Sequence, residues 1–206
     1  MEIHIYELEK NSDKARIIAQ IHQIAFPNFF LTQLGIGFLT TLYQGYIEDP
    51  MSGIIVVEND NNRILGFVAY SKDYSKFYSK LKRKHLFKFA VCSLGAAICH
   101  PSFIKRLLGA FKKSDEVKRS EKYVELASIG VLKNVQGEGI GKKLIGYLIS
   151  NIDFEIYEYI SLETDAVNND KVNEFYKKNG FKFQREYTTT EGRLMNEYRL
   201  RPEVNV

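Results

Sequence analysis

Residues 136–141, Gln-Gly-Glu-Gly-Ile-Gly, have the composition and surroundings of an anion-binding turn. They follow an alternating, β-branched stretch at 123–132 and open a helical pattern whose apolar positions continue to residue 148. The first N–H groups of a helix lack partners within the helix and lie at the positive end of its dipole. Three alternate glycines leave room for a phosphate to reach backbone nitrogen, and Lys142 and Lys143 add positive charge. We therefore expect this turn to hold a phosphate group.

The turn differs from the two common nucleotide-binding motifs. It lacks the final Gly-Lys-Ser/Thr of a P-loop, and its Gly-x-Gly-x-Gly spacing is not the Gly-x-Gly-x-x-Gly of a dinucleotide fold. It also does not join the first strand and helix of the chain, where a dinucleotide motif belongs. An anion site of another kind is therefore indicated.

Hydrophobic periodicity predicts the elements that must position this turn. Strands are expected over residues 1–8, 54–58, 63–70, 123–132, 159–165, 181–188 and 193–200, and helices over 17–25, 38–46, 140–148 and 168–179. The second and third strands form a hairpin through the turn residues 59–62, and the last two strands form an antiparallel pair. This order predicts a mixed α/β (α+β) fold.

In this context, residues 136–141 match the motif Gln/Arg-x-x-Gly-x-Gly/Ala, and the chain resembles the GNAT superfamily of acyl-CoA N-acyltransferases. A second motif supports the resemblance, with Asn169, the pair Phe175-Tyr176 and the pair Gly180-Phe181 at the family's spacing. The resemblance covers residues 3–70 and 123–200. It departs from the family at Lys133, where a proline is frequent, and at Val172, where an alanine is usual.

The resemblance implies a single GNAT domain over residues 1–206. Its sheet would have six or seven strands, mostly antiparallel, flanked by helices, with a helical insertion at 71–122 between the third and fourth strands. It implies that acetyl-CoA is the co-substrate. The residues that would contact acetyl-CoA are Ile129, Gly130 and Val131 along the pantetheine arm, Gln136, Gly137, Glu138, Gly139, Ile140, Gly141 and Lys142 at the pyrophosphate, and Asn169 and Tyr176 from the following helix.

Two residues are the candidates for proton transfer. Tyr176 matches the family's frequent general acid, a phenol that protonates the departing thiolate of coenzyme A; a role in the hydrophobic core is the alternative. Glu125, eleven residues before Gln136, resembles the glutamate base of the histone-acetylating branch. An amine of pKa about 10.4 must lose a proton before it attacks, which a carboxylate can accept.

The sequence leaves alternatives to Glu125 as base. Alternation along the strand places Glu125 on one face with Ala127, Ile129 and Val131, an apolar setting that would raise its pKa, and Ser128 on the other face. Glu125 could instead be a solvated carboxylate or one paired with a lysine. Ser128, Glu163 or Asp165 could also serve as base, or the enzyme could lack a dedicated base.

The net charge of +4 conceals an uneven distribution. Residues 72–122 contain 14 Lys or Arg and 4 Asp or Glu, a net charge of +10, so the other 155 residues carry −6. This segment reads as helical and amphipathic, and three interpretations stay open: a cap over the acceptor site, a patch for an anionic membrane surface, or a groove for an acidic acceptor such as a nucleotide sugar. Nucleic acid is disfavoured because no reading motif accompanies the charge.

These observations predict an N-acetyltransferase of the EC 2.3.1 type that moves an acetyl group from acetyl-CoA to an amine of a small molecule or of a peptide, by direct attack in a ternary complex. A transferase of a longer acyl chain, and a coenzyme A-binding or regulatory protein without catalysis, are the alternatives. No histidine has metal-ligand spacing, so no metal is expected. Without a signal peptide or a membrane span, a cytoplasmic protein is expected, with peripheral membrane contact through residues 72–122 left open. The oligomeric state and the acceptor cannot be read from the sequence.

Overall fold

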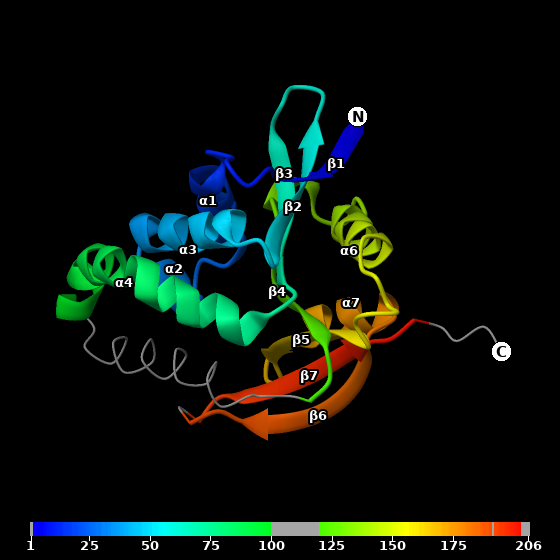
Figure 1. The fold of residues 1–206 in the computed structure, drawn as a ribbon. Helices are drawn as coiled ribbons and strands as arrows, with labels where there is room; N and C mark the ends of the chain where they lie inside the picture. Colours follow the sequence, from blue (N-terminus) through cyan, green and yellow to red (C-terminus); the bar gives the residue numbers. More distant parts are fainter. Residues whose placement is uncertain (1, 100–119, 191, 203–206) are drawn as a thin grey trace.

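A computed structural model describes residues 2–99, 120–190 and 192–202, and within them seven strands form one sheet in the order β1-β2-β3-β4-β5-β7-β6 (Figure 1). Each neighbouring pair is antiparallel except β4 and β5, which are parallel. The strands are β1 (Ile3–Glu7), β2 (Ser52–Asn59), β3 (Ile64–Ser71), β4 (Tyr123–Val131), β5 (Tyr159–Asp165), β6 (Lys182–Thr188) and β7 (Leu194–Leu200). The predicted mixed, mostly antiparallel seven-stranded sheet is therefore confirmed.

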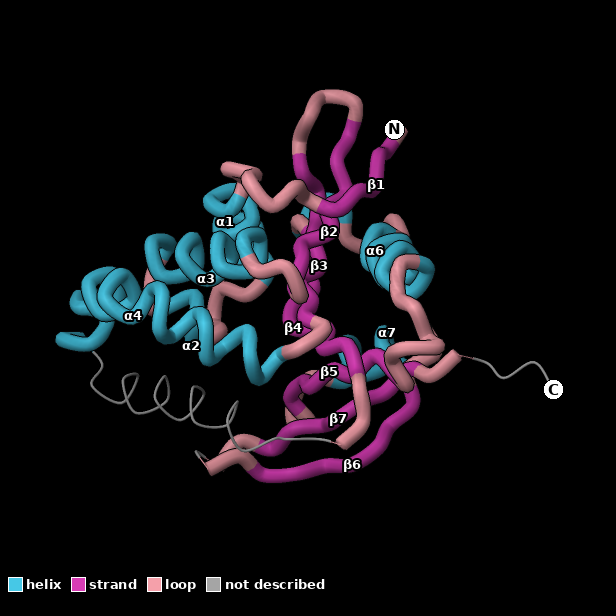
Figure 2. The backbone as a smooth tube through the Cα atoms, viewed as in Figure 1, coloured by secondary structure: helices cyan, strands magenta, loops and turns pink. Residues whose placement is uncertain are grey.

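Helices lie on both sides of this sheet (Figures 1 and 2). One side carries α1 (Ala15–Ala25), α2 (Phe30–Gln33), α3 (Ile36–Glu48) and α4 (Tyr74–Cys99), and the other carries α6 (Ile140–Ser150) and α7 (Asp170–Lys178). A 3-10 turn, Lys133–Val135, connects β4 to the glycine turn before α6. The short helix α2 was not predicted by periodicity, because four residues are too few to show a helical repeat.

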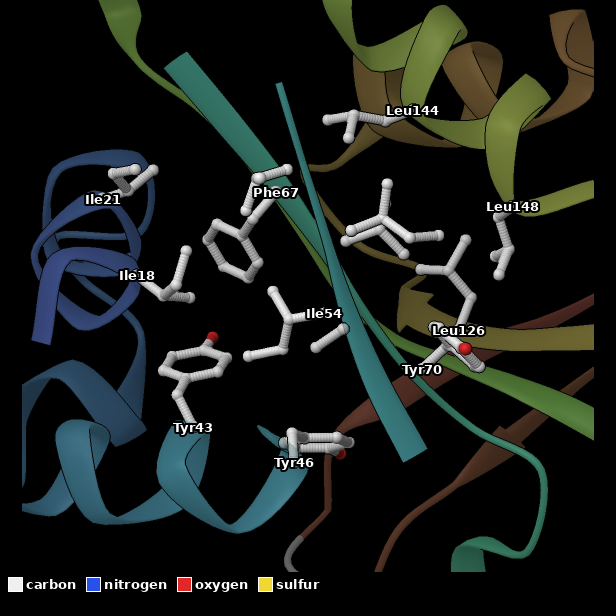
Figure 3. Close-up of a cluster of buried hydrophobic side chains, with 14 of the residues drawn as sticks. Ile18, Ile21, Tyr43, Tyr46, Ile54, Phe67, Tyr70, Leu126, Leu144 and Leu148 are labelled. Carbon is white, nitrogen blue, oxygen red and sulfur yellow. The ribbon is translucent and has the colours of Figure 1, made fainter. Parts of the chain in front are cut away.

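The hydrophobic core occupies both faces of the sheet, as Figure 3 shows. Phe67 of β3 packs toward Ile18 and Tyr43 on the side of α1 and α3, whereas Leu126 of β4 lies with Leu144 on the side of α6. Residues 64–71 of β3 are buried throughout because helices cover the sheet on both sides. The central strands are thus held in place from two directions.

A β-bulge in β4 corrects one expectation from the sequence. Ala69 is opposite Ser128 and Tyr70 is opposite Leu126, so Ala127 has no partner in β3. The extra residue reverses the alternation, since two residues of the bulged strand face one on its neighbour. Glu125 therefore shares its face with Ser128 and Gly130, toward α3 and α4. The prediction that Glu125 lies on the face of Ile129 and Val131 is wrong.

The first part of the expected insertion is the helix α4, which leaves β3 directly and packs on α3. Gly45 of α3 makes this approach feasible, because a Cβ atom there would overlap the side chain of Leu81 on α4. The expectations for residues 100–119 of the insertion lie outside the described residues. No helix among the described residues is long and apolar enough to cross a membrane.

Candidate active site

A gap opens between β4 and β5 just beyond Glu125. The two parallel strands pair only over residues 123–125 and 159–161; beyond the Glu125–Ser161 pair, β4 stays with β3 and β5 stays with β7. The N–H of Leu132 donates to Leu65 O at 2.9 Å, on the side of β3. Because backbone groups alternate in direction along a strand, those of Ile129 and Val131 turn toward the gap. An open strand edge therefore faces β5, as expected for the contact with pantetheine.

Gln136 differs from its expected role. Its backbone N–H points at Lys133 O at 3.4 Å, and its side-chain amide donates to the carbonyl of Val131 at 3.0 Å. The backbone of Gln136 is therefore engaged within the turn. Its side chain instead covers the last open carbonyl of β4.

The following six backbone amides, those of residues 137–142, have no acceptor in the described part of the chain. Gly137 and Gly139 have φ of 89° and 79°, values that L side chains rarely adopt, and Lys143 N makes the first helical bond, to Gly139 O at 3.0 Å. The first turn of α6 contains no acidic residue, and Lys142 and Lys143 are exposed. This group of donors at a helix N-terminus is suited to a phosphate or pyrophosphate.

Asn169 lies at the N-terminus of α7 and holds that helix against the end of β5. Its side-chain nitrogen donates to Thr164 Oγ1 at 2.8 Å and to Asp165 O at 3.1 Å. Asn173 adds a bond of 3.0 Å to the same Asp165 carbonyl. The side-chain oxygen of Asn169 is therefore the group that remains for a cofactor contact.

Tyr176 lies on α7, packed against Phe181 and Tyr198 with ring centroids 5.8 and 6.3 Å away. Burial raises the pKa of Tyr176, so its phenol stays protonated at neutral pH. Its hydroxyl forms no hydrogen bond with any described residue. An aromatic ring in the core with an uncommitted hydroxyl is consistent with both readings of the sequence.

The candidate bases occupy different settings. Glu125 is 8% exposed and opposes Ser71 of β3 and Ser161 of β5. Asp165 is paired with Arg193, at 2.7 Å, and its carboxylate is therefore engaged. Glu163 lies two residues beyond Ser161, on the same face of β5. It is hydrogen-bonded to Tyr187, whose pKa is raised mainly by burial and further by the charge of Glu163.

The gap joins the two faces of the sheet. Glu125 faces the side of α3 and α4, whereas Tyr176 belongs to α7 on the opposite side (Figure 1). A group placed in the gap can therefore be approached by a base from one face and by a phenol from the other. Such a geometry is suited to acyl transfer, in which one reactant loses a proton and the leaving group gains one.

Aromatic and charged side chains border the face of Glu125 farther along the gap. Arg193, near the turn between β6 and β7, lies over the ring of Phe29 at 5.7 Å and also pairs with Asp165. This contact connects the segment between α1 and α2 with the last strand pair.

Buried polar side chains tie α1 and α3 to β4 near the gap. His22 Nδ1 lies 2.6 Å from the hydroxyl of Tyr43, which in turn lies 3.4 Å from Ser128 Oγ. Burial lowers the pKa of His22 to about 4, so the imidazole is neutral at pH 7. Ser128 is thus connected through Tyr43 to the buried His22.

Sequence motifs did not identify Tyr46, Tyr74 and Tyr78, which gather on the same face as Glu125. The i, i+4 spacing of Tyr74 and Tyr78 was the available signal, since it places both rings on one side of a helix. Among the described residues, no group of three His, Cys, Asp or Glu side chains could hold a metal ion.

The open sheet, the glycine turn and the helix that follows define an acyl-CoA N-acyltransferase, and a family comparison agrees. The family described as Acetyltransferase (GNAT) family matches residues 18–181. The chain therefore belongs to the GNAT acetyltransferase family, as its sequence predicts.

Solved structures share the fold at low sequence identity. NAA60 of Arabidopsis thaliana in complex with acetyl-CoA is 16% identical, with a TM-score of 0.59 over 98% of this chain and 99% of that one. A GNAT family acetyltransferase from Bacillus cereus is 14% identical, with a TM-score of 0.58 over 98% of each chain. Spermidine N-acetyltransferase SpeG from Vibrio cholerae is 15% identical, with a TM-score of 0.58 over 96% and 94%. A comparison with curated protein sequences gives no match.

Replacement of His22 with Gln should make stability less sensitive to acid. The unfolded histidine binds a proton below pH 6.5 and the folded one only near pH 4, so wild-type stability falls as pH falls through this window, by up to ~1.4 kcal/mol per pH unit from this group. Urea unfolding from pH 7 to 4 measures the difference. His4→Gln, at an exposed site, should retain the wild-type slope. Equal slopes for His22→Gln and wild type would contradict a neutral buried His22.

Proposed function

We propose that the protein transfers an acetyl group from acetyl-CoA to an amine, by direct attack in a ternary complex. The observation that carries the proposal is the open edge of β4, which leads directly to the six unpaired amides of residues 137–142. A pantetheine arm that pairs like a strand needs the open edge, and the pyrophosphate that follows it in coenzyme A needs the unpaired amides. The match to an acetyltransferase family over residues 18–181 supports the same donor.

Acetyl-CoA fits the residues that line the gap. The amides of the pantetheine arm would pair with Ile129 and Val131, with Gly130 between them, after the Gln136 side chain leaves the Val131 carbonyl. The amides of Gly137, Glu138, Gly139, Ile140, Gly141 and Lys142 would bind the pyrophosphate. Asn169 would contribute its side-chain oxygen. When bound, the co-substrate supplies an acetyl group activated as a thioester.

The residues on the two faces would move the protons. Glu125 accepts the proton that the acceptor ammonium must lose, so that its nitrogen can form the bond to the acetyl carbonyl carbon. As the carbon–sulfur bond breaks, the hydroxyl of Tyr176 donates its proton to the thiolate of coenzyme A. A proton released by the new amide nitrogen restores the phenol. Glu125 then releases the proton that it took from the ammonium to solvent, so that atoms and charge balance without a covalent enzyme intermediate.

The acceptor is an amine of a small molecule or of a peptide. Two similar structures support this range: the spermidine N-acetyltransferase from Vibrio cholerae is named for a small amine, and the NatC complex, with a TM-score of 0.54, is bound to a Gag peptide and CoA. The acceptor reaches the gap from the face of Glu125, which the aromatic segment between α1 and α2 borders.

Replacement of Gly139 with Ala should weaken acetyl-CoA binding. A side chain at φ 79° costs roughly 1–2 kcal/mol, and relief of that strain would rotate the amides away from the pyrophosphate. Gly192→Ala is the matched control, because Gly192 has φ 81° and equally open surroundings in the turn between β6 and β7. Calorimetry should show about tenfold weaker binding for Gly139→Ala alone. Equal affinities for the two variants would argue against the anion site.

Release of free thiol from acetyl-CoA, with spermidine, glucosamine and a peptide bearing a free α-amine as acceptors, tests the function and the role of Tyr176. Wild type should release thiol with at least one of them. Tyr176→Phe should lower kcat about a hundredfold and leave the affinity for acetyl-CoA within about twofold, since it removes a proton and little contact area. An unchanged kcat would show that Tyr176 is a residue of the hydrophobic core without a role in proton transfer.

Replacement of Glu125 with Gln should lower kcat/KM at pH 7 by about a hundredfold or more, with partial recovery at alkaline pH, where the amine is already neutral. Glu163→Gln is the matched control, because it neutralises a carboxylate on the same face of the neighbouring strand. A pH–rate profile of each variant is the measurement. Alkaline rescue seen only with Glu163→Gln would transfer the role of base to Glu163.

A further inference from the structure

The inserted helix begins directly above the candidate base. Ser71, the last residue of β3, is opposite Glu125 in β4, and α4 begins three residues later at Tyr74. The first two turns of α4 therefore leave the sheet where Glu125 faces outward. The close approach at Gly45 holds these turns against α3.

Three tyrosines form a connected cluster at this point. Tyr46 of α3 is buried and packs against Phe77, with the two rings tilted and their centroids 4.1 Å apart. The rings of Tyr74 and Tyr78 meet edge to face at 4.7 Å. The hydroxyl of Tyr78 shares hydrogen bonds with those of Tyr46 and Tyr74. The hydroxyl of Tyr78 therefore connects the other two hydroxyls of the cluster.

The charge of Glu125 acts on all three tyrosines. Its negative charge adds to burial in raising the pKa of Tyr46, Tyr74 and Tyr78. Two further titratable groups face Glu125 from the other strands: Tyr187 on β6, and Glu163 on β5, to which Tyr187 is hydrogen-bonded. Both lie beyond the gap, on the side away from α4. The cluster is therefore a polar group that the helical side of the fold places near Glu125.

We propose that Tyr78, fixed by Tyr46 and Tyr74, is a positioning residue for the Glu125 carboxylate, so that helix α4 completes the acceptor side of the active site. This inference rests on the proposed function, in which Glu125 accepts a proton. A phenol beside a buried carboxylate stabilises the charged form and restricts its rotation. The part of the insertion next to the sheet thus positions the candidate base.

Tyr78→Phe tests the proposal with little change in shape. Loss of the hydroxyl should raise the pKa of Glu125, because it removes stabilisation of the carboxylate, and should move the acidic limb of kcat/KM to higher pH by about half to one unit. The acceptor is whichever of spermidine, glucosamine and the peptide wild type acetylates fastest. With this acceptor, kcat/KM of Tyr78→Phe at pH 7 should fall about tenfold, and KM for acetyl-CoA should stay constant.

The carboxyl ¹³C resonance of Glu125, assigned by its loss in Glu125→Gln, reports the same shift without turnover. It would be titrated in the complex with coenzyme A. Tyr6→Phe is the matched control, because the hydroxyl of Tyr6 on the edge strand β1 donates to the carboxylate of Glu58 on β2 at 2.7 Å. This control should lose comparable stability in urea and leave both the resonance and the pH profile unchanged.

A double variant separates positioning from a general loss of structure. In the background of Glu125→Gln, Tyr78→Phe should cause no further loss of kcat/KM, because the residue through which it acts is gone. An additive loss, or an unshifted Glu125 titration in Tyr78→Phe, would overturn the proposal. If wild type itself releases no thiol, the proposed function fails. If wild type is active but the Glu125 titration in Tyr78→Phe is unshifted, only the proposed role of the tyrosine cluster fails.

Discussion

The separation of β4 from β5 after the Glu125–Ser161 pair is the constraint on which the rest of the site depends. β5 pairs along its length with β7 through its opposite edge, so it stays in the sheet after it separates from β4. The Gln136 side chain covers the Val131 carbonyl, but the other backbone groups on the open edge of β4 have no neighbouring strand, and an unsatisfied polar group costs about 1–3 kcal/mol where water is excluded. A ligand with its own amides removes that cost, so the gap favours a strand-like molecule such as pantetheine.

The bulge at Ala127 sets the chemistry on either side of this gap. Without the extra residue, Glu125 would face α6 and α7, on the same side as Tyr176. With it, the carboxylate faces α3 and α4, and the phenol of Tyr176 stays on the opposite face. The candidate base and the candidate acid therefore lie on opposite faces of the gap. One unpaired residue in β4 therefore decides on which face of the sheet the Glu125 carboxylate lies.

Features with local causes could be predicted from the sequence, and features that depend on pairing between distant segments could not. The glycine turn and its free amides follow from spacing within a few residues of Gly139, and the order of elements along the chain follows from hydrophobic periodicity. The face of Glu125 was predicted wrongly because the bulge depends on the register with Tyr70 in β3. The commitment of the Asn169 amide depends on where β5 ends. The tyrosines around Glu125 come together only because α4 docks on α3 at Gly45.

Hydrogen exchange of the backbone amides tests the central claim most directly, because it reports the open edge itself. The amides of Ile129 and Val131, and those of residues 137–142, would be followed with and without saturating acetyl-CoA. The account predicts that both groups become strongly protected together when acetyl-CoA binds, while the amides of the β6–β7 turn at Gly192 stay unchanged. Protection that is absent from residues 129–142, or confined to another part of the fold, would contradict it.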